Sequence, residues 1–240
     1  MFFLESIALL GLPGSGKSRI QQALLTSQAA DQSLLSRDVK IVEAGGQSDK
    51  PFDLVLSVID VRSVLVAGRD EWLEVQLQEM LSSSHAVIFN FLEASSLDEQ
   101  SWWGAWMKAN AAELAVFRVL NSKLPDSLFS LLSGYEQGGY PPKVLPQLAW
   151  DSFEFEVGPI SLEHLLFGLD SSKQNLGIKI ARVTGVVKTI EYANLVELQG
   201  SALRWDSYAA AQDAVAGKIS IVGQGLDRSW LQEIIKASLV

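Results

Sequence analysis

Short apolar runs alternate with amphipathic segments along the first part of the chain. The apolar runs cover residues 7–10, 39–42, 54–59, 86–89 and 114–117. Apolar residues recur at helical spacing over residues 18–28, 71–81, 98–113 and 126–132. A run that is apolar at every position suits a parallel strand that is covered on both faces. The alternation therefore predicts βαβ units in an α/β fold, with a doubly wound and mostly parallel sheet.

The pattern changes between residues 133 and 147, where glycines and prolines replace the apolar periodicity. Such a stretch is typical of a linker. Beyond it, strand patterns cover residues 153–157, 178–188, 195–199 and 219–222, and helical patterns cover residues 162–169 and 227–239, with Asp227 placed as an N-cap. We therefore predict an α/β domain at residues 1–133, a linker at 134–148, and a smaller α+β domain with an antiparallel sheet at 149–240.

A glycine-rich loop directly follows the first apolar run. Residues 11–18 read G-L-P-G-S-G-K-S and match the phosphate-loop (P-loop) pattern G-x-x-x-x-G-K-[S/T] at every fixed position. Glycines let such a loop curl until several backbone N–H groups point at one phosphate chain, and the following helix adds the positive end of its dipole. The predicted nucleotide-binding residues of the loop are Gly11, Pro13, Gly14, Ser15, Gly16, Lys17 and Ser18. Lys17 is expected to reach the β- and γ-phosphates and Ser18 to ligate Mg²⁺, so the sequence predicts a P-loop NTPase fold that binds GTP or ATP.

Composition narrows the range of partners. The chain has 240 residues, 48% of them hydrophobic, and a net charge of −9. That charge disfavours nucleic acids and anionic membranes, and the absence of cysteine excludes thiolate metal sites and a cysteine nucleophile. His85 and His164 are the only histidines, and nothing in the sequence groups them into a metal site. With no signal-peptide pattern and no run of about 18 apolar residues, we expect a cytoplasmic protein.

A second candidate for nucleotide chemistry lies at the end of the predicted strand 39–42. Residues 43–46 read E-A-G-G and have the spacing E-x-x-G. A P-loop enzyme holds Mg²⁺ with a carboxylate at such a strand end, directly or through water, and a glycine there lets its N–H approach the γ-phosphate. We therefore predict that Glu43 shares Mg²⁺ with Ser18 and that Gly46 contacts the nucleotide. The alternative is a strand end at the surface, followed by a flexible pair of glycines.

Several motifs follow one another in the order of a known family. They are E-A-G-G with Asp49 and Pro51 just after it, S-V-I-D at 57–60, S-H-A-V-I-F-N at 84–90, A-R-V-T-G-V-V at 181–187 and I-S-I-V-G-Q-G-L-D at 219–227. Together with the P-loop, they resemble the CobW-like family of P-loop GTPases, which are relatives of metal-centre and cofactor-assembly GTPases and include proteins of the zinc metallochaperone type. The resemblance covers nearly the whole chain. It implies a slow Mg²⁺-dependent GTPase in which Lys17 and Glu43 are the catalytic residues.

The chain departs from that family in two places. Where the family has the guanine-reading motif N-K-x-D, this chain has N-F-L-E, so Asn90 and Glu93 are the implied base-binding residues and Phe91 replaces the lysine. The interval between Ser18 and Glu43 has room for one helix and one strand, and it lacks the family's switch region and C-x-C-C motif. We therefore predict a shortened relative that binds GTP or ATP with slow or lost hydrolysis.

Two other functions fit the same residues. One is a non-enzymatic regulatory or scaffold protein that uses the nucleotide as a structural ligand. The other is a P-loop small-molecule kinase, although the sequence between the nucleotide motifs has no arginine-rich lid. A protein client would bind through the C-terminal domain or through the helix that carries Trp102, Trp103 and Trp106. For that helix, the spacing of the tryptophans favours packing against the sheet or the second domain, and the docking surface is the alternative.

Overall fold

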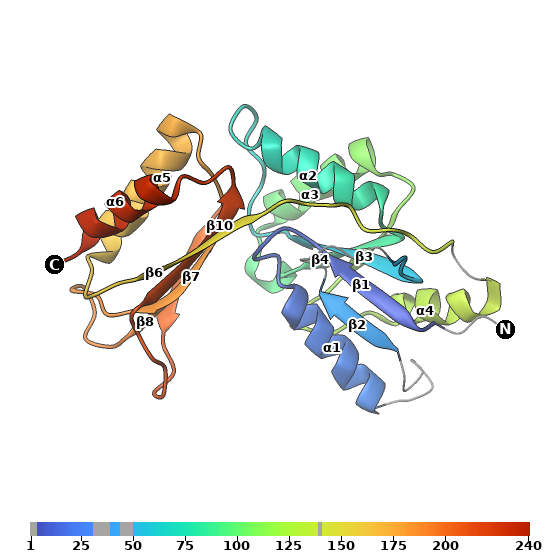
Figure 1. Cartoon of the computed structure of the whole chain (residues 1–240). Coiled ribbons are helices and arrows are strands. Elements are labelled where there is room, and N and C mark those ends of the chain that lie inside the picture. The colour runs from blue at the N-terminus through green and yellow to red at the C-terminus, as the bar shows by residue number, and fades with distance from the viewer. Residues whose placement is uncertain (1–3, 31–38, 44–49, 139–140) are drawn as a thin grey trace. The chain divides into compact units, whose positions relative to one another are not determined.

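A computed structural model describes residues 4–30, 39–43, 50–138 and 141–240 (Figure 1). The chain divides into two units, Met1–Leu148 and Ala149–Val240, and each has its own five-stranded sheet. No helix in the described ranges is long and apolar enough to cross a membrane.

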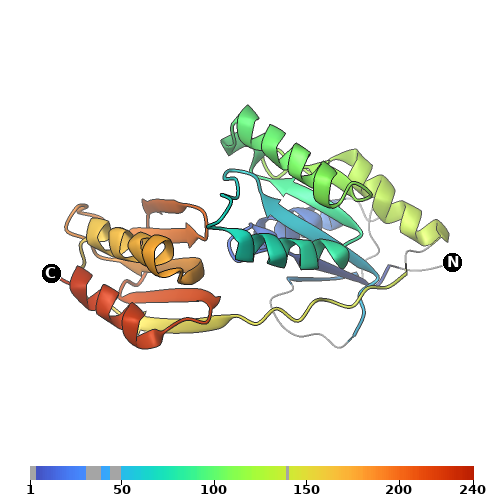
Figure 2. The ribbon, with the colours of Figure 1, turned by 90° about the horizontal axis from the view of Figure 1, so that it is seen from above.

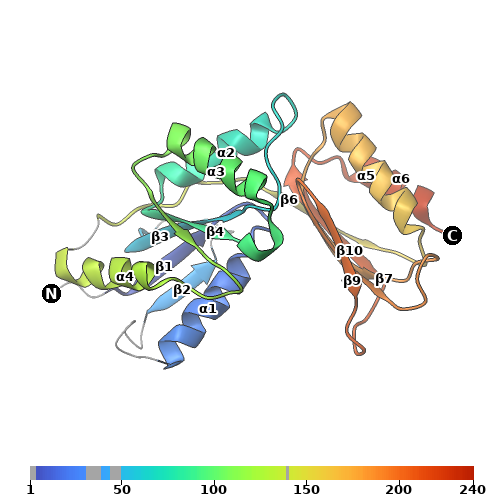
Figure 3. The same ribbon diagram turned by 180° about the vertical axis from the view of Figure 1, so that it is seen from behind.

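The sheet of the first unit is entirely parallel, with the strand order β2-β1-β3-β4-β5. Its strands are β1 (Ser6–Leu10), β2 (Lys40–Glu43), β3 (Leu54–Asp60), β4 (Ala86–Asn90) and β5 (Ala115–Arg118). Its helices are α1 (Lys17–Ala30), α2 (Glu71–Ser82), α3 (Leu97–Asn110) and α4 (Asp126–Gly138), with a 3₁₀ turn, η1 (Leu92–Ala94), after β4. Helices α1 and α4 cover one face of the sheet and α2 and α3 the other (Figure 3). The predicted doubly wound α/β fold is confirmed.

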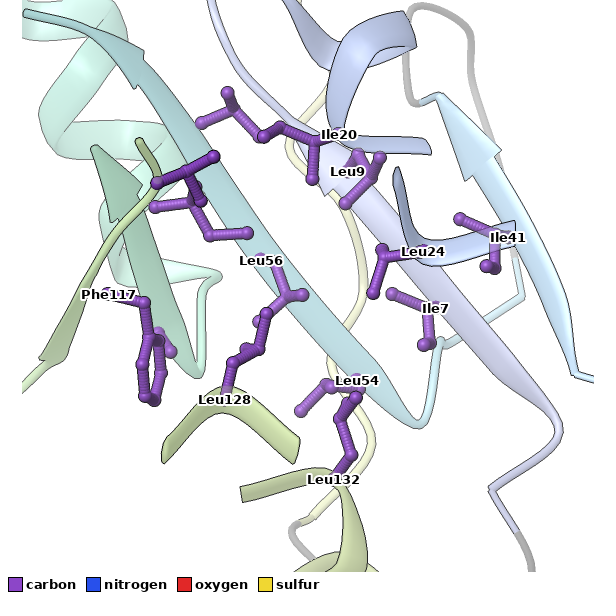
Figure 4. Close-up of a cluster of buried hydrophobic side chains, with 14 of the residues drawn as sticks. Ile7, Leu9, Ile20, Leu24, Ile41, Leu54, Leu56, Phe117, Leu128 and Leu132 are labelled. Atoms are coloured by element: carbon purple, nitrogen blue, oxygen red, sulfur yellow. The ribbon is translucent and has the colours of Figure 1, made fainter. Parts of the chain in front are cut away.

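Continuous apolar strands build this sheet because both of its faces are buried. Alternate residues of β1 and β3 point to the face covered by α1 and α4, where they form one core cluster. Figure 4 labels ten members of that cluster: Ile7, Leu9, Ile20, Leu24, Ile41, Leu54, Leu56, Phe117, Leu128 and Leu132. The intervening residues Ala8, Leu10 and Val55 belong to a second cluster, which also contains Met80 of α2.

The segment at residues 134–148 differs from the predicted linker. Helix α4 continues to Gly138, so residues 134–138 are helical. A single glycine inside a helix costs only about 1 kcal/mol, which a longer helix tolerates. Residues 141–148, drawn in yellow in Figure 2, run back along the first unit. Lys143 pairs with Phe52 in an antiparallel bridge, and Leu145 is buried with the second core cluster.

His85 connects this returning segment to the sheet. Its Nδ1 accepts a hydrogen bond from the N–H of Val55 at 2.9 Å, and its Nε2 lies 3.0 Å from the carbonyl oxygen of Pro141. A neutral ring protonated on Nε2 satisfies both contacts. Burial lowers the pKa of His85, the Pro141 carbonyl raises it in part, and the charge of Lys143 lowers it further, so the net pKa lies below its usual 6.5.

We expect the stability that His85 contributes to decrease on acidification. Because the folded-state pKa is lowered, the unfolded state binds more protons below pH 6.5, and stability is lost as pH falls from 6.5 through the folded pKa. His85→Gln removes the titrating ring, so the unfolding midpoint in urea should fall less between pH 7 and pH 5 than in the parent chain. His164→Gln, at an exposed position of the second unit, is the matched control. Equal pH profiles for the parent and His85→Gln would contradict this assignment.

The second unit combines an antiparallel sheet with two helices. The strand order is β6-β10-β7-β8-β9. Its elements are β6 (Asp151–Glu156), α5 (Leu162–Leu176), β7 (Lys179–Val187), β8 (Val196–Ser201), β9 (Trp205–Ala209), β10 (Lys218–Gln224) and α6 (Arg228–Ser238). Both helices lie against one face of this sheet (Figure 3). The side chain of Asp227 caps α6 by accepting from the N–H groups of Ser229 and Trp230, as predicted.

Strand β9 is absent from the sequence-based prediction. It reads W-D-S-Y-A, pairs only with β8, and is exposed or half-exposed at every position. Trp205 packs against the core, but the remaining positions do not alternate with it in an apolar pattern. The pairing with β8 and not the residue pattern therefore makes this segment a strand.

Candidate functional site

The glycine-rich loop connects the carboxyl end of β1 to the first turn of α1. All three of its glycines have positive φ, 157° at Gly11, 90° at Gly14 and 84° at Gly16, where L side chains are strained. The loop closes with a hydrogen bond from the Ser15 N–H to the Leu12 carbonyl at 3.1 Å. Because α1 begins at Lys17, the N–H groups of its first turn and the positive end of its dipole lie at this loop. The structure therefore has the strand-loop-helix context that the sequence predicts.

Lys17 is folded back over the loop. Its ammonium group donates to the carbonyl oxygens of Gly11, at 2.9 Å, and of Leu12, at 3.1 Å. These bonds hold a positive charge beside the same backbone that would surround a phosphate chain. Ser18, the next residue of α1, is exposed at the helix start. The Ser15 hydroxyl is buried and, among the described residues, has no hydrogen-bond partner.

Asn90 binds the backbone of the loop from the end of β4. It is the last residue of β4, is fully buried, and donates from Nδ2 to the Ser15 carbonyl at 3.1 Å and to the Gly16 carbonyl at 3.4 Å. Its Oδ1 accepts from the N–H of Phe91 at 3.0 Å. The N-F-L-E segment predicts a base contact for Asn90, and in the structure its amide connects β4 to the P-loop backbone.

Phe91 covers one side of the loop. A Cβ built on Gly16 would overlap the Asn90 amide and lie 2.7 Å from the Phe91 ring, so the ring packs directly on this glycine. The guanidinium of Arg62 lies 3.9 Å from the ring centroid, and that of Arg19 lies 4.7 Å from it. Both distances suit cation–π contacts.

Arg62 is itself held at the end of β3. Its guanidinium contacts the Asp60 carboxylate through two nitrogens, with Nη2 to Oδ2 at 2.6 Å and Nε to Oδ1 at 2.9 Å. The Asp60 side chain also accepts from the backbone N–H of Arg62 at 3.0 Å, so both the backbone and the side chain of Arg62 are bound to the same carboxylate. This pair keeps the Arg62 guanidinium on the Phe91 ring.

Glu93 also lies on this side of the loop and binds Arg19. Its Oε1 accepts from Nη2 of Arg19 at 2.5 Å, and its Oε2 accepts from the N–H of Asn121 at 3.2 Å. Nε of Arg19 donates to the Ser122 hydroxyl at 2.6 Å. Burial opposes ionisation of Glu93, but hydrogen bonds from its own backbone, from Arg19 and from Asn121, together with the Arg19 charge, outweigh it and lower its pKa.

Four residues of this site are missing from the sequence analysis: Arg19, Arg62, Asn121 and Ser122. Residues 121 and 122 follow β5, and carboxyl ends of parallel strands meet at one edge of a sheet. The strand predicted at 114–117 therefore indicated the position of Asn121 and Ser122, because the loop that follows this strand must lie beside Asn90. No pattern in the sequence distinguishes the two arginines from other surface arginines.

Glu43 ends β2 and lies opposite Leu9 of the neighbouring strand β1. This places the half-buried carboxylate on the strand next to the one that leads into the P-loop. Gly46 lies outside the described residues. Within the described ranges, no group of three or more histidine, aspartate or glutamate side chains could hold a metal ion. The shared Mg²⁺ site of Ser18 and Glu43 stays a prediction.

The tryptophan helix packs against the sheet. Trp103 is 1% exposed and Trp106 is 8% exposed, and Trp103 meets Phe89 of β4 edge to face. Both indole N–H groups have partners, the carbonyl of Ser63 for Trp103 and the carboxylate of Glu74 for Trp106, each at 3.0 Å. The alternative of a protein-docking surface on these two side chains is wrong, because they are buried in the first unit.

Comparisons with known proteins gave matches only among solved structures. No family model and no curated protein matches this chain. Solved structures that align with it include the Zn(II)-bound YjiA GTPase from E. coli, with 12% identity over 99% of this chain and 98% of that chain and a TM-score of 0.37. Sup35 complexed with GDP aligns at 11% identity over 92% of this chain and 67% of that chain, with a TM-score of 0.37. The bacterial selenocysteine-specific elongation factor EF-Sec aligns at 10% identity over 95% and 43%, with a TM-score of 0.33. Values this low identify neither a family nor an activity.

Proposed function

We propose that the first unit binds a nucleoside triphosphate, GTP or ATP, at residues 11–18. The observation that carries the proposal is the position of the Lys17 ammonium, which lies on the loop carbonyls beside the start of α1. Cationic and N–H donors converge there around a glycine backbone with no room for an added Cβ at Gly16. The hydroxyl of Ser15, which has no partner in the part of the chain that the structure describes, adds a buried polar group that a phosphate oxygen can satisfy.

Mg²⁺ fits the oxygen ligands at the same edge. Ser18 offers a hydroxyl at the start of α1, and Glu43 offers a carboxylate at the end of β2. Hydroxyl and carboxylate oxygens are ligands that Mg²⁺ prefers. When bound, the ion would neutralise phosphate charge between these two residues.

We also propose that the chain is a shortened CobW-like protein with slow or lost hydrolysis. In support, the strand that ends at Glu43 lies directly beside β1, as an E-x-x-G motif near a P-loop requires. Lys17 and the loop N–H groups supply charge stabilisation, whereas hydrolysis also needs a positioned water molecule. The family places the residues for that second task on the switch region that this sequence lacks.

Binding and turnover should be measured together. We expect calorimetry to show one site for the triphosphate and to show an affinity at least about tenfold higher with Mg²⁺ than with a chelator, since a charge-assisted phosphate contact is worth roughly 1.4 kcal/mol or more. Ser18→Ala should reduce this Mg²⁺ effect. Ser27→Ala, on the same helix with its hydroxyl bonded to Ala23, is the matched control. Phosphate release with GTP and ATP should be slow or absent. No binding of either nucleotide, or the same affinity in chelator, would overturn the proposal.

A further inference from the structure

The side of the P-loop on which Phe91 and Glu93 lie carries an unusual concentration of backbone strain. We call Arg19, Phe91, Glu93, Asn121 and Ser122 the Arg19 cluster. In the described residues, three positions other than glycine have positive φ, and all three belong to this cluster: Phe91 at 63°, Asn121 at 50° and Ser122 at 61°. Each costs on the order of 1 kcal/mol, and such residues collect at functional sites. Three strained backbones in one cluster indicate a site and not a simple loop packing.

Each strained residue contacts one of the two charged members. The Phe91 ring lies under the Arg19 guanidinium, the Asn121 N–H binds Glu93, and the Ser122 hydroxyl binds Arg19. The backbone thus positions Glu93 and its neighbours around a single guanidinium. Arg19 is the member best able to leave, because its long side chain starts from α1, only two residues after Lys17.

The chemistry of Glu93 defines what can replace Arg19. A carboxylate accepts two parallel N–H bonds, either from a guanidinium fork or from a ring N–H and an adjacent amino group. The Watson–Crick edge of guanine has that second arrangement, whereas adenine has an amino donor beside a ring acceptor. In the structure Arg19 donates one bond, from Nη2 to Oε1 of Glu93, and the Asn121 N–H binds Oε2. Guanine would therefore have to displace Arg19 to give the carboxylate two parallel bonds, whereas adenine has no comparable use for it.

We propose that Arg19 is a specificity-determining residue that acts as an internal ligand of Glu93 and competes with guanine. The inference depends on the proposed nucleotide site and names its base selectivity. A guanine nucleotide must break the Arg19–Glu93 ion pair, which is only about a quarter exposed on each side chain, to reach the carboxylate. An adenine nucleotide binds without breaking it. Parent protein should therefore discriminate GTP from ATP by less than about 100-fold.

Competition binding of GTP and ATP to the full chain tests the proposal through the ratio of the two affinities. That ratio cancels any uniform effect of the lost positive charge on phosphate binding. We expect Arg19→Ala to raise the GTP preference by about tenfold, since Glu93 regains a free carboxylate. Adding Glu93→Ala to Arg19→Ala should return the ratio to the parent value. Arg182→Ala, at an exposed position of β7 in the second unit, is the matched control.

The outcomes separate this inference from the function on which it depends. An unchanged or lower GTP preference in Arg19→Ala would overturn the inference, as would a gain that persists in the double variant. If nucleotide still binds with Mg²⁺ in those cases, the proposed function stands. If neither the parent nor Arg19→Ala binds any nucleotide, both fail. Circular dichroism melting curves check that each variant is folded.

Discussion

Lys17→Ala should weaken triphosphate binding by at least about tenfold, which corresponds to roughly 1.4 kcal/mol. In the structure the ammonium donates to the carbonyls of Gly11 and Leu12, so the side chain lies on the loop. Binding therefore gains a charge-assisted contact at little cost in side-chain ordering. Alanine removes that contact and leaves the loop glycines and the start of α1 unchanged.

Titration calorimetry with Mg²⁺ and either triphosphate measures the Lys17 effect. Lys108→Ala is the control, since this exposed lysine lies in the last turn of α3, away from the loop. Its affinity should match that of the parent. The melting temperature of Lys17→Ala should remain close to that of the parent, because the ammonium donates its two bonds to backbone carbonyls at a half-exposed position. Equal affinities for Lys17→Ala and the parent would exclude this lysine from the site.

Gly16→Ala should destabilise the first unit by about 2 to 4 kcal/mol. The backbone at Gly16 has φ of 84°, which costs an alanine roughly 1 kcal/mol or more. The new Cβ would also overlap the Asn90 amide and press on the Phe91 ring, so the buried bonds from Asn90 to the loop would have to shift. Overpacking of this kind costs about 1 to 3 kcal/mol.

Gly104→Ala provides the opposite result within the same unit. This glycine lies inside α3, and an added Cβ would have nothing within 4 Å. Alanine there should stabilise by about 0.5 to 1 kcal/mol through helix propensity. Urea unfolding measures the free energy of unfolding of both variants. It thus compares a glycine that the loop conformation requires with a helical glycine that nothing in its surroundings requires. If Gly16→Ala unfolds within about 0.5 kcal/mol of the parent, the tight packing among Gly16, Asn90 and Phe91 is not energetically important.

The structure gives Asn90 a contact that differs from the one predicted from sequence. The N-F-L-E segment predicts a base contact for this residue, but its amide is buried against the carbonyls of Ser15 and Gly16. It therefore acts first on the shape of the P-loop. In our proposal, base selectivity depends on Glu93 and on Arg19, which is bound to it.

The P-loop, the parallel strands and the cap of α6 could be predicted from the sequence, because each depends on residues that are close together in the chain. The P-loop follows from fixed spacing, because its glycines, Lys17 and Ser18 act within one turn of chain. The parallel strands follow from continuous apolar runs, since burial on both faces leaves no place for polar residues. The cap at Asp227 is equally local, because an N-cap side chain bonds only to the next few N–H groups.

The contacts that give the site its character depend on the order of strands in the sheet. Arg19 meets Glu93 across 74 positions and Ser122 across 103. These partners come together because β1, β3, β4 and β5 lie side by side with their carboxyl ends at one edge. Periodicity reports which face of a helix or strand is buried, but it does not report the distant segment that covers it. The burial of Trp103 was decided at that same tertiary level, since it depends on contacts with Phe89 and Ser63 in other segments. Strand β9 likewise is a strand through its pairing with β8 and not through a residue pattern of its own.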